Sequence, residues 1–197
     1  DCENAAAKRR IRQHASQHRD LGVTIPGDDL YSRQPLCEII LEEGFSFILV
    51  CKPASHKTLY RRLEESEIQV TVVKRWTGSR RETDTYRFAN CVPLRDTDDA
   101  LEANWCEITT TLEDGTVIYK NSFVTNHEIT KENVIEIVTA GRARWKIENE
   151  NNNVLKTGGY NLEHNFGHGK KHLSRLLLTF NILAFLFHLL EVGESAF

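Results

Sequence analysis

The sequence predicts an α/β fold that is interrupted by a block of antiparallel strands. Three observations support this prediction. Residues 3–65 alternate helical and strand patterns, residues 68–125 are rich in β-branched and aromatic side chains, and helical patterns return from Thr130 onwards. Strands that alternate with helices typically form parallel sheets, whereas consecutive strands joined by tight turns pair antiparallel.

Residues 1–67 are expected to form the parallel part of the sheet. The expected elements are, in order, a helix over residues 3–19, a strand at 23–25, a helix that closes at Gly44, a strand at 45–50 and a helix at 56–65. The segment 45–50 is an apolar run apart from Ser46, which is typical of a strand that is buried on both faces.

Residues 68–127 are predicted to be an insertion of antiparallel strands. The four candidate strands cover residues 68–76, 83–89, 105–112 and 116–125. Glu113-Asp114-Gly115 is a hairpin signal between the last two of them.

Residues 128–197 are expected to be C-terminal helices of the core. One helical pattern begins near a cap at Thr130 and continues to Lys156, and a second runs from about Lys170 to Leu190. The apolar density of the second approaches that of a membrane span. Arg175, Asn181 and other polar residues interrupt it, so it is predicted to be buried in a soluble core, with no membrane as partner.

Charge and cysteine usage exclude some classes of protein. The net charge of −3 argues against a small, strongly basic DNA-binding module, but not against an enzyme that binds DNA through local basic patches and metal ions. The five cysteines form no CxxC pair, so reduced thiols are expected. The lack of methionine and the helical pattern that begins at Glu3 are interpreted as a fragment of a longer protein.

The most informative segment is Arg142 to Lys171. Arg144 and Glu148 are four residues apart and share a helix face, with Lys156 about two turns further on. A carboxylate between cations suits a site where a divalent metal lies next to a phosphate. The alternative is an ordinary surface ion pair, although Arg before Glu is the less favourable order for one. The asparagines at 149 and 151–153 are also poor helix formers.

The string Arg144-Trp145-Lys146-Ile147-Glu148-Asn149, followed by Leu155-Lys156, resembles the glutamate signature of DDE-type insertion-sequence transposases. The stretch from Gly159 to Lys170 resembles one branch of that family. The resemblance covers nearly the whole chain and implies a partial RNase H-like fold with a β-strand insertion ahead of the glutamate helix. The family has a tyrosine where this chain has Gly141, and its trailing lysine lies one residue earlier than Lys156.

The resemblance also implies a second metal ligand. In that family the second catalytic aspartate ends a core strand within a D-x-x-Y-type turn, and here the candidate is Asp28, with Asp29 as neighbour or substitute. Without the resemblance, two aspartates after a strand indicate a turn and a helix cap. The carboxyl end of a parallel strand is nevertheless where such sheets place their sites. The first catalytic aspartate is expected on an earlier strand that this chain lacks, so the isolated chain is expected not to catalyse strand transfer.

Two other motifs have competing interpretations. His164, His168 and His172 are spaced as zinc ligands would be, but Gly167 and Gly169 break the helix there. Phosphate contacts from Lys170 and Lys171, or simple packing, are the alternatives. The basic cluster around Arg75, with Trp76 within it, is either a patch for the DNA backbone or an ordinary solvated hairpin.

Together these observations predict a DNA transposase fragment from a prokaryotic cytoplasm, associated with the nucleoid. Asp28 and Glu148 would ligate Mg²⁺ or Mn²⁺, while Arg144, Lys156, Lys170, Lys171 and Arg75 would bind double-stranded DNA at transposon ends. A homodimer in the synaptic complex is a further expectation. The alternative is a catalytically inactive remnant that acts at most as a DNA-binding module.

Overall fold

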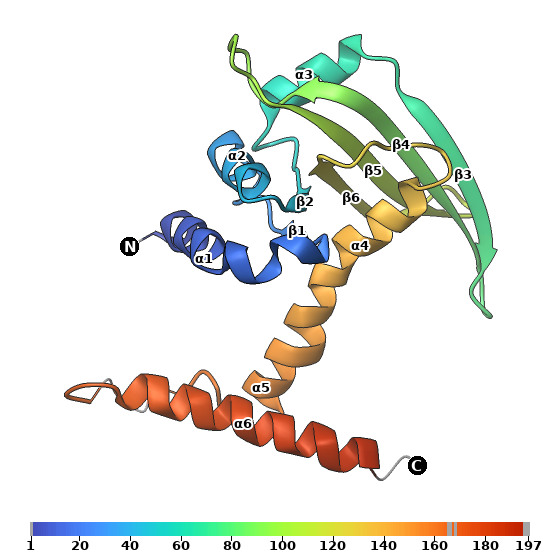
Figure 1. The fold of residues 1–197 in the computed structure, drawn as a ribbon. Helices are drawn as coiled ribbons and strands as arrows, with labels where there is room; N and C mark the ends of the chain where they lie inside the picture. The colour runs from blue at the N-terminus through green and yellow to red at the C-terminus, as the bar shows by residue number, and fades with distance from the viewer. Residues whose placement is uncertain (1, 165–166, 168, 195–197) are drawn as a thin grey trace. The chain divides into compact units, whose positions relative to one another are not determined.

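The computed structural model describes residues 2–164, 167 and 169–194, and for residues 147, 148, 150 and 191–194 it describes the backbone alone. The chain divides into two compact units, Asp1–Ala143 and Arg144–Phe197. The first contains the sheet and most of the helices, and the second contains the C-terminal helices (Figure 1).

The first unit is built on one mixed six-stranded sheet in the order β1-β2-β6-β5-β4-β3. Its strands are β1 (Thr24–Gly27), β2 (Ser46–Val50), β3 (Gln69–Trp76), β4 (Arg81–Pro93), β5 (Glu102–Leu112) and β6 (Val117–Thr125). Strands β1 and β2 are parallel, and every other neighbouring pair is antiparallel. The predicted α/β class and the antiparallel block are therefore confirmed.

Strand β2 links the two parts of the sheet. It pairs with β1 on one side and with β6 on the other, so the predicted insertion continues the same sheet and is not a separate layer. Its side chains alternate between the two faces: Phe47 and Leu49 belong to one apolar core, and Ile48 and Val50 to the other. This confirms the prediction that residues 45–50 form a strand buried on both faces.

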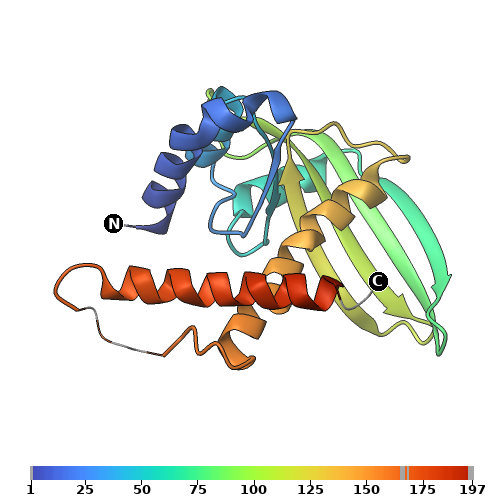
Figure 2. The same ribbon diagram turned by 60° about the horizontal axis from the view of Figure 1, so that its bottom comes forward.

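Helices cover both faces of the sheet (Figures 1 and 2). One core lies under α1 (Glu3–His18), α2 (Gln34–Glu42) and α3 (Lys57–Glu65), and it includes Trp105, Leu59 and Leu63. The other lies under α4 (Val134–Lys146), whose residues Val134, Ile137 and Val138 pack against strand residues such as Phe88 and Phe123.

The helical pattern predicted from Thr130 to Lys156 forms an uninterrupted helical stretch from Val134 to Thr157, and its geometry changes along its length. After α4 the backbone widens into a π-helix over Ile147–Asn152 and then forms α5 (Asn153–Thr157). The asparagines are the physical reason, because their side chains compete for hydrogen bonds with the backbone. Asn149 Nδ2 donates to the carbonyl oxygen of Trp145 at 3.1 Å, and Asn153 Nδ2 donates to Asn149 Oδ1 at 2.9 Å.

The second unit ends in α6 (Leu173–Glu194), which is apolar on all sides. Tyr160 connects it to the preceding loop, since its hydroxyl lies 2.5 Å from His188 Nδ1 and its ring packs edge-on against Phe185. Within the described part of the chain, the span Leu173–Leu190 is long and apolar enough to cross a membrane by length and composition alone. The unit by itself does not bury these side chains, so burial of this helix in a soluble core stays a prediction.

Candidate functional site

The candidate site lies where the two parallel strands end. Asp28 and Asp29 follow β1 directly, and the loop from Cys51 to His56 follows β2. Gly27, the last residue of β1, leaves space for the side chain of its neighbour Leu49 on β2, because a Cβ atom at position 27 would lie 2.6 Å from Leu49 Cδ2. The carboxyl ends of parallel strands are the usual position for binding sites in open α/β sheets.

The carboxylate of Asp29 is the centre of a hydrogen-bond network between the two loops. Asp29 Oδ1 accepts from the backbone N–H of Lys52 at 2.6 Å, and Asp29 Oδ2 accepts from the hydroxyl of Ser55. Arg33 Nη1 also donates to the carbonyl oxygen of Ser55, at 2.6 Å. Both oxygens of Asp29 are thus engaged in fastening one loop to the other.

Ser32 and His56 extend this hydrogen-bond network into the protein interior. Ser32 Oγ donates to the carbonyl oxygen of Asp29 at 2.8 Å, and it lies 2.8 Å from His56 Nε2. A hydroxyl has one proton, so when Ser32 gives it to the carbonyl, the proton between Ser32 and the imidazole must belong to Nε2. His56 Nε2 is also 3.7 Å from Asp29 Oδ1.

Burial determines the charge of His56. The residue is 5% exposed, and desolvation lowers the pKa of its imidazole below the usual 6.5; the nearby Arg33 cation lowers it further, while the Asp29 carboxylate opposes the shift. The imidazole is therefore neutral at pH 7 and acts as a hydrogen-bond donor. Ser32 is fully buried, so it is not placed to act as a nucleophile on a substrate.

Asp28 differs from its neighbour. Its Oδ1 accepts a local hydrogen bond from the backbone N–H of Asp29 at 2.8 Å, and its carbonyl oxygen accepts from Tyr31 N at 2.9 Å. The side chain is half-buried. In the part of the chain that the structure describes, Asp28 Oδ2 has no hydrogen-bond partner, so Asp28 can offer that oxygen to a ligand.

The other half of the predicted metal site falls in the second unit. Glu148 lies in the π-helix, but its side chain is outside the described residues, as is His168. Arg144 is half-buried, and Lys156 Nζ forms an ion pair with Glu163 Oε1 at 2.8 Å. Lys170 and Lys171 are exposed just before α6.

The structure gives a physical reason for Gly141, where the resemblance leads one to expect a tyrosine. A Cβ atom at position 141 would lie 2.8 Å from the ring of Phe123 and 3.0 Å from Ile48 Cγ2. Helix α4 therefore approaches the sheet more closely than any larger side chain at this position would allow.

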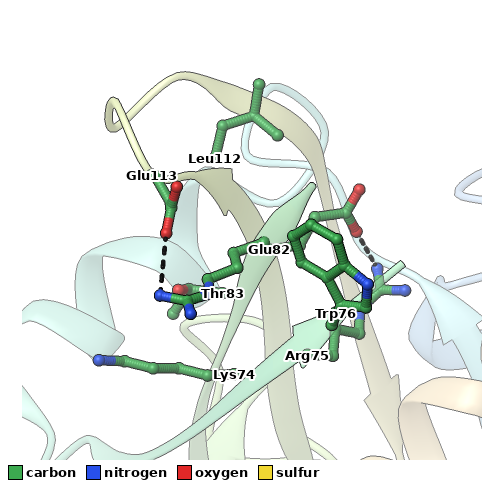
Figure 3. Close-up of a pocket in the computed structure, with 8 residues that line it drawn as sticks. Lys74, Arg75, Trp76, Glu82, Thr83, Leu112 and Glu113 are labelled. Atoms are coloured by element: carbon green, nitrogen blue, oxygen red, sulfur yellow. Dashed lines mark ion pairs between the residues drawn. The ribbon is translucent and has the colours of Figure 1, made fainter. Parts of the chain in front are cut away.

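The basic cluster around Arg75 lies where β3 ends and β4 begins, and Figure 3 shows Arg75 there beside Trp76 and Glu82. The guanidinium of Arg75 is paired with Glu82 at 2.6 Å and with Asp84 at 2.8 Å, and both of these carboxylates are buried. Trp76 is 64% exposed beside it, and the two line a hollow of about 580 Å³. The role of Arg75 in DNA binding stays a prediction, and its pairing in this structure is with carboxylates.

The network residues Ser32, Lys52, Ser55 and His56 were not among the site residues proposed from sequence. One signal could have indicated them: they flank or follow strands whose carboxyl ends meet at the edge where Asp28 was placed. Among the described residues, no three His, Cys, Asp or Glu side chains come together as a metal cluster. The zinc alternative stays a prediction, because His168 lies outside those residues.

No protein-family model matches this chain, and no curated protein matches it either.

Proposed function

We propose that this chain is part of the catalytic domain of a DDE-type DNA transposase, with Asp28 as one of its metal ligands. The observation that carries the proposal is the position of Asp28. It follows β1 at the carboxyl edge of a parallel strand pair, and one of its carboxylate oxygens is not engaged by the described residues. A catalytic carboxylate in an α/β sheet is expected in such a place.

The arrangement around Asp28 supports an RNase H-like core as the finer description of the fold. A parallel pair adjoins antiparallel strands, and helices lie on both faces. Helix α4 packs on the sheet, carries Arg144 in its last turn and leads into the π-helix that contains Glu148. The sequence resemblance supports the same assignment.

Oxygen donors of this kind fit Mg²⁺ or Mn²⁺, which prefer carboxylates and water. Asp28 and Glu148 would hold the metal. When bound, a divalent ion would stabilise charge on the attacking and leaving oxygens of a phosphodiester. DNA phosphates would be contacted by Arg144, Lys156, Lys170 and Lys171. These contacts would fix the position of the DNA at the site. Double-stranded DNA, a homodimer and a prokaryotic cytoplasm are part of the same proposal.

A crystal structure of the chain with Mn²⁺ and a short duplex tests this proposal. We expect anomalous density for Mn²⁺ with Asp28 and Glu148 as ligands, and loss of that density in Glu148→Ala. Carboxylates too far apart to share one metal site, or metals more than about 4 Å apart, would contradict a transposase mechanism.

The second candidate is an inactive remnant that binds DNA. It is distinguished by filter binding at constant salt with Mg²⁺ or with EDTA. DNA binding that is unchanged by EDTA and by Glu148→Ala supports the remnant, whereas Mg²⁺-dependent DNA binding that Glu148→Ala removes supports a transposase catalytic domain.

A further inference from the structure

Asp28 and Asp29 are adjacent in sequence but make different contacts. Asp29 accepts hydrogen bonds from Lys52 N and Ser55 Oγ, both of which lie in the loop after β2. Asp28 accepts one local bond, from the backbone N–H of Asp29 itself. The first carboxylate after β1 is therefore the more available of the two, and the second connects two strands.

Resting on the proposed function, we propose that Asp29, Ser55 and His56 are positioning residues for Asp28. Their hydrogen bonds join the loop after β1 to the loop after β2. The backbone N–H of Asp29 in turn holds the carboxylate of Asp28 in one orientation, at 2.8 Å. The metal ligand is Asp28, and Asp29 acts through the backbone.

His56 and Ser32 support this arrangement from the interior. Ser32 Oγ donates to the carbonyl oxygen of Asp29 at 2.8 Å, and His56 Nε2 lies 2.8 Å from the same Oγ. Both side chains are buried, so water does not compete for these bonds. Residues that hold a metal ligand in place commonly change metal affinity by about 10-fold to 100-fold when they are removed.

Asparagine and alanine substitutions separate a ligand from a positioning residue. At position 29, the amide oxygen of asparagine can still accept from Lys52 N, and its NH₂ group can donate to Ser55 Oγ. At position 28, asparagine loses the anionic oxygen that a divalent ion prefers. Asp29→Asn should therefore recover most of what Asp29→Ala loses, whereas Asp28→Asn should bind no better than Asp28→Ala.

The experiment is an NMR titration of the ¹⁵N-labelled full chain with Mn²⁺. Its readout is the paramagnetic broadening of backbone amide signals. In the unsubstituted chain we expect broadening centred on residues 27–30. Asp29→Ala should weaken the apparent affinity by roughly 10-fold with the same amides broadened, and Asp29→Asn should restore most of it. Both Asp28 variants should abolish the broadening at this edge.

The outcomes distinguish the two proposals. If the unsubstituted chain shows no broadening near Asp28, the metal site and the proposed function both fail. If Asp28→Asn abolishes broadening but Asp29→Asn binds as weakly as Asp29→Ala, Asp29 is a ligand and the positioning role is wrong. If both Asp29 variants bind like the unsubstituted chain, the positioning role is also wrong, while the proposed function stands.

Ser55 keeps the proposal testable if Asp29→Ala does not fold. Ser55→Ala removes the hydroxyl that Asp29 Oδ2 accepts from, and Ser55→Thr keeps it. Weaker Mn²⁺ binding by Ser55→Ala, restored by Ser55→Thr, supports the positioning role. Unchanged binding by Ser55→Ala overturns it.

Discussion

The environment of His56 illustrates how a single residue contributes to the candidate site. Its ring is buried between the loops that follow β1 and β2, and its Nε2 atom lies within hydrogen-bond distance of Ser32. The two residues are 24 positions apart in sequence, and this contact forms because β1 and β2 are parallel neighbours. Asp28 could be proposed from sequence because it directly follows a strand, but its supporting partners depend on that tertiary pairing.

The lowered pKa of His56 makes folding stability depend on pH. The unfolded imidazole, with a pKa near 6.5, takes up a proton more readily than the folded one. Stability should therefore be complete above about pH 6.5 and decrease below it, with a slope of at most about 1.4 kcal/mol per pH unit. Urea denaturation between pH 5 and 8 measures this slope. The variant His56→Gln should show a shallower slope, and an equally steep one would assign the effect to other groups.

At the level of secondary structure, most strands and helices were predictable because each has a clear periodicity. The run from Phe45 to Val50 is the clearest example, since it is apolar at every position except Ser46. The change to π-helical geometry over Ile147–Asn152 was less predictable, because side-chain hydrogen bonds of asparagine accompany it and apolar spacing does not indicate it. The pairing of β2 with β6 also could not be read from local sequence.

The close contact between α4 and the sheet predicts a specific cost for a larger side chain. Gly141→Leu should lower the free energy of unfolding by about 3 kcal/mol, because the ring of Phe123 would have to move. Ala140→Leu, at an exposed position one residue earlier, should change it by less than about 0.5 kcal/mol. Chemical denaturation measures both, and equal stability of the two variants would contradict the close approach.

The ion pairs of Arg75 stabilise the β3–β4 hairpin. Removing this guanidinium leaves Asp84 and, in part, Glu82 buried without a charge partner, although Arg80 Nε still contacts Glu82 at 2.9 Å. Arg75→Ala should therefore cost about 2–3 kcal/mol of unfolding free energy. Arg81→Ala removes an exposed pair with Glu113 and should cost less than about 1 kcal/mol. Thermal unfolding compares them, and a small effect of Arg75→Ala would show that water penetrates to these carboxylates.

At the level of the whole molecule, the five thiols report on global folding. Cys37, Cys51 and Cys106 are buried, and desolvation raises the pKa of each thiol, to about 12 for Cys37 and Cys106. Cys2 and Cys91 are exposed. Low thiolate content and lack of access should make the buried three unreactive in the native state.

Labelling with an aromatic disulfide reagent at pH 8 tests this expectation. We expect two thiols to react quickly and three to react only as fast as the protein unfolds. Cys2→Ser with Cys91→Ser should leave only the slow phase. More than two fast thiols would indicate that the first unit opens locally around its core.

The pairing of β2 with β6 has a consequence for synthesis on the ribosome. Residues 46–50 can pair with β1 as soon as they emerge, but their second neighbour, including Phe123 to Thr125, emerges about 75 residues later. At an ordinary elongation rate this delay is roughly 4–15 s. During that interval Ile48 and Val50 lack the layer that later covers them. A nascent chain of this protein therefore carries an unpaired edge of β2 until β6 emerges, and an uncovered apolar face of β2, which chaperones can bind, until α4 emerges.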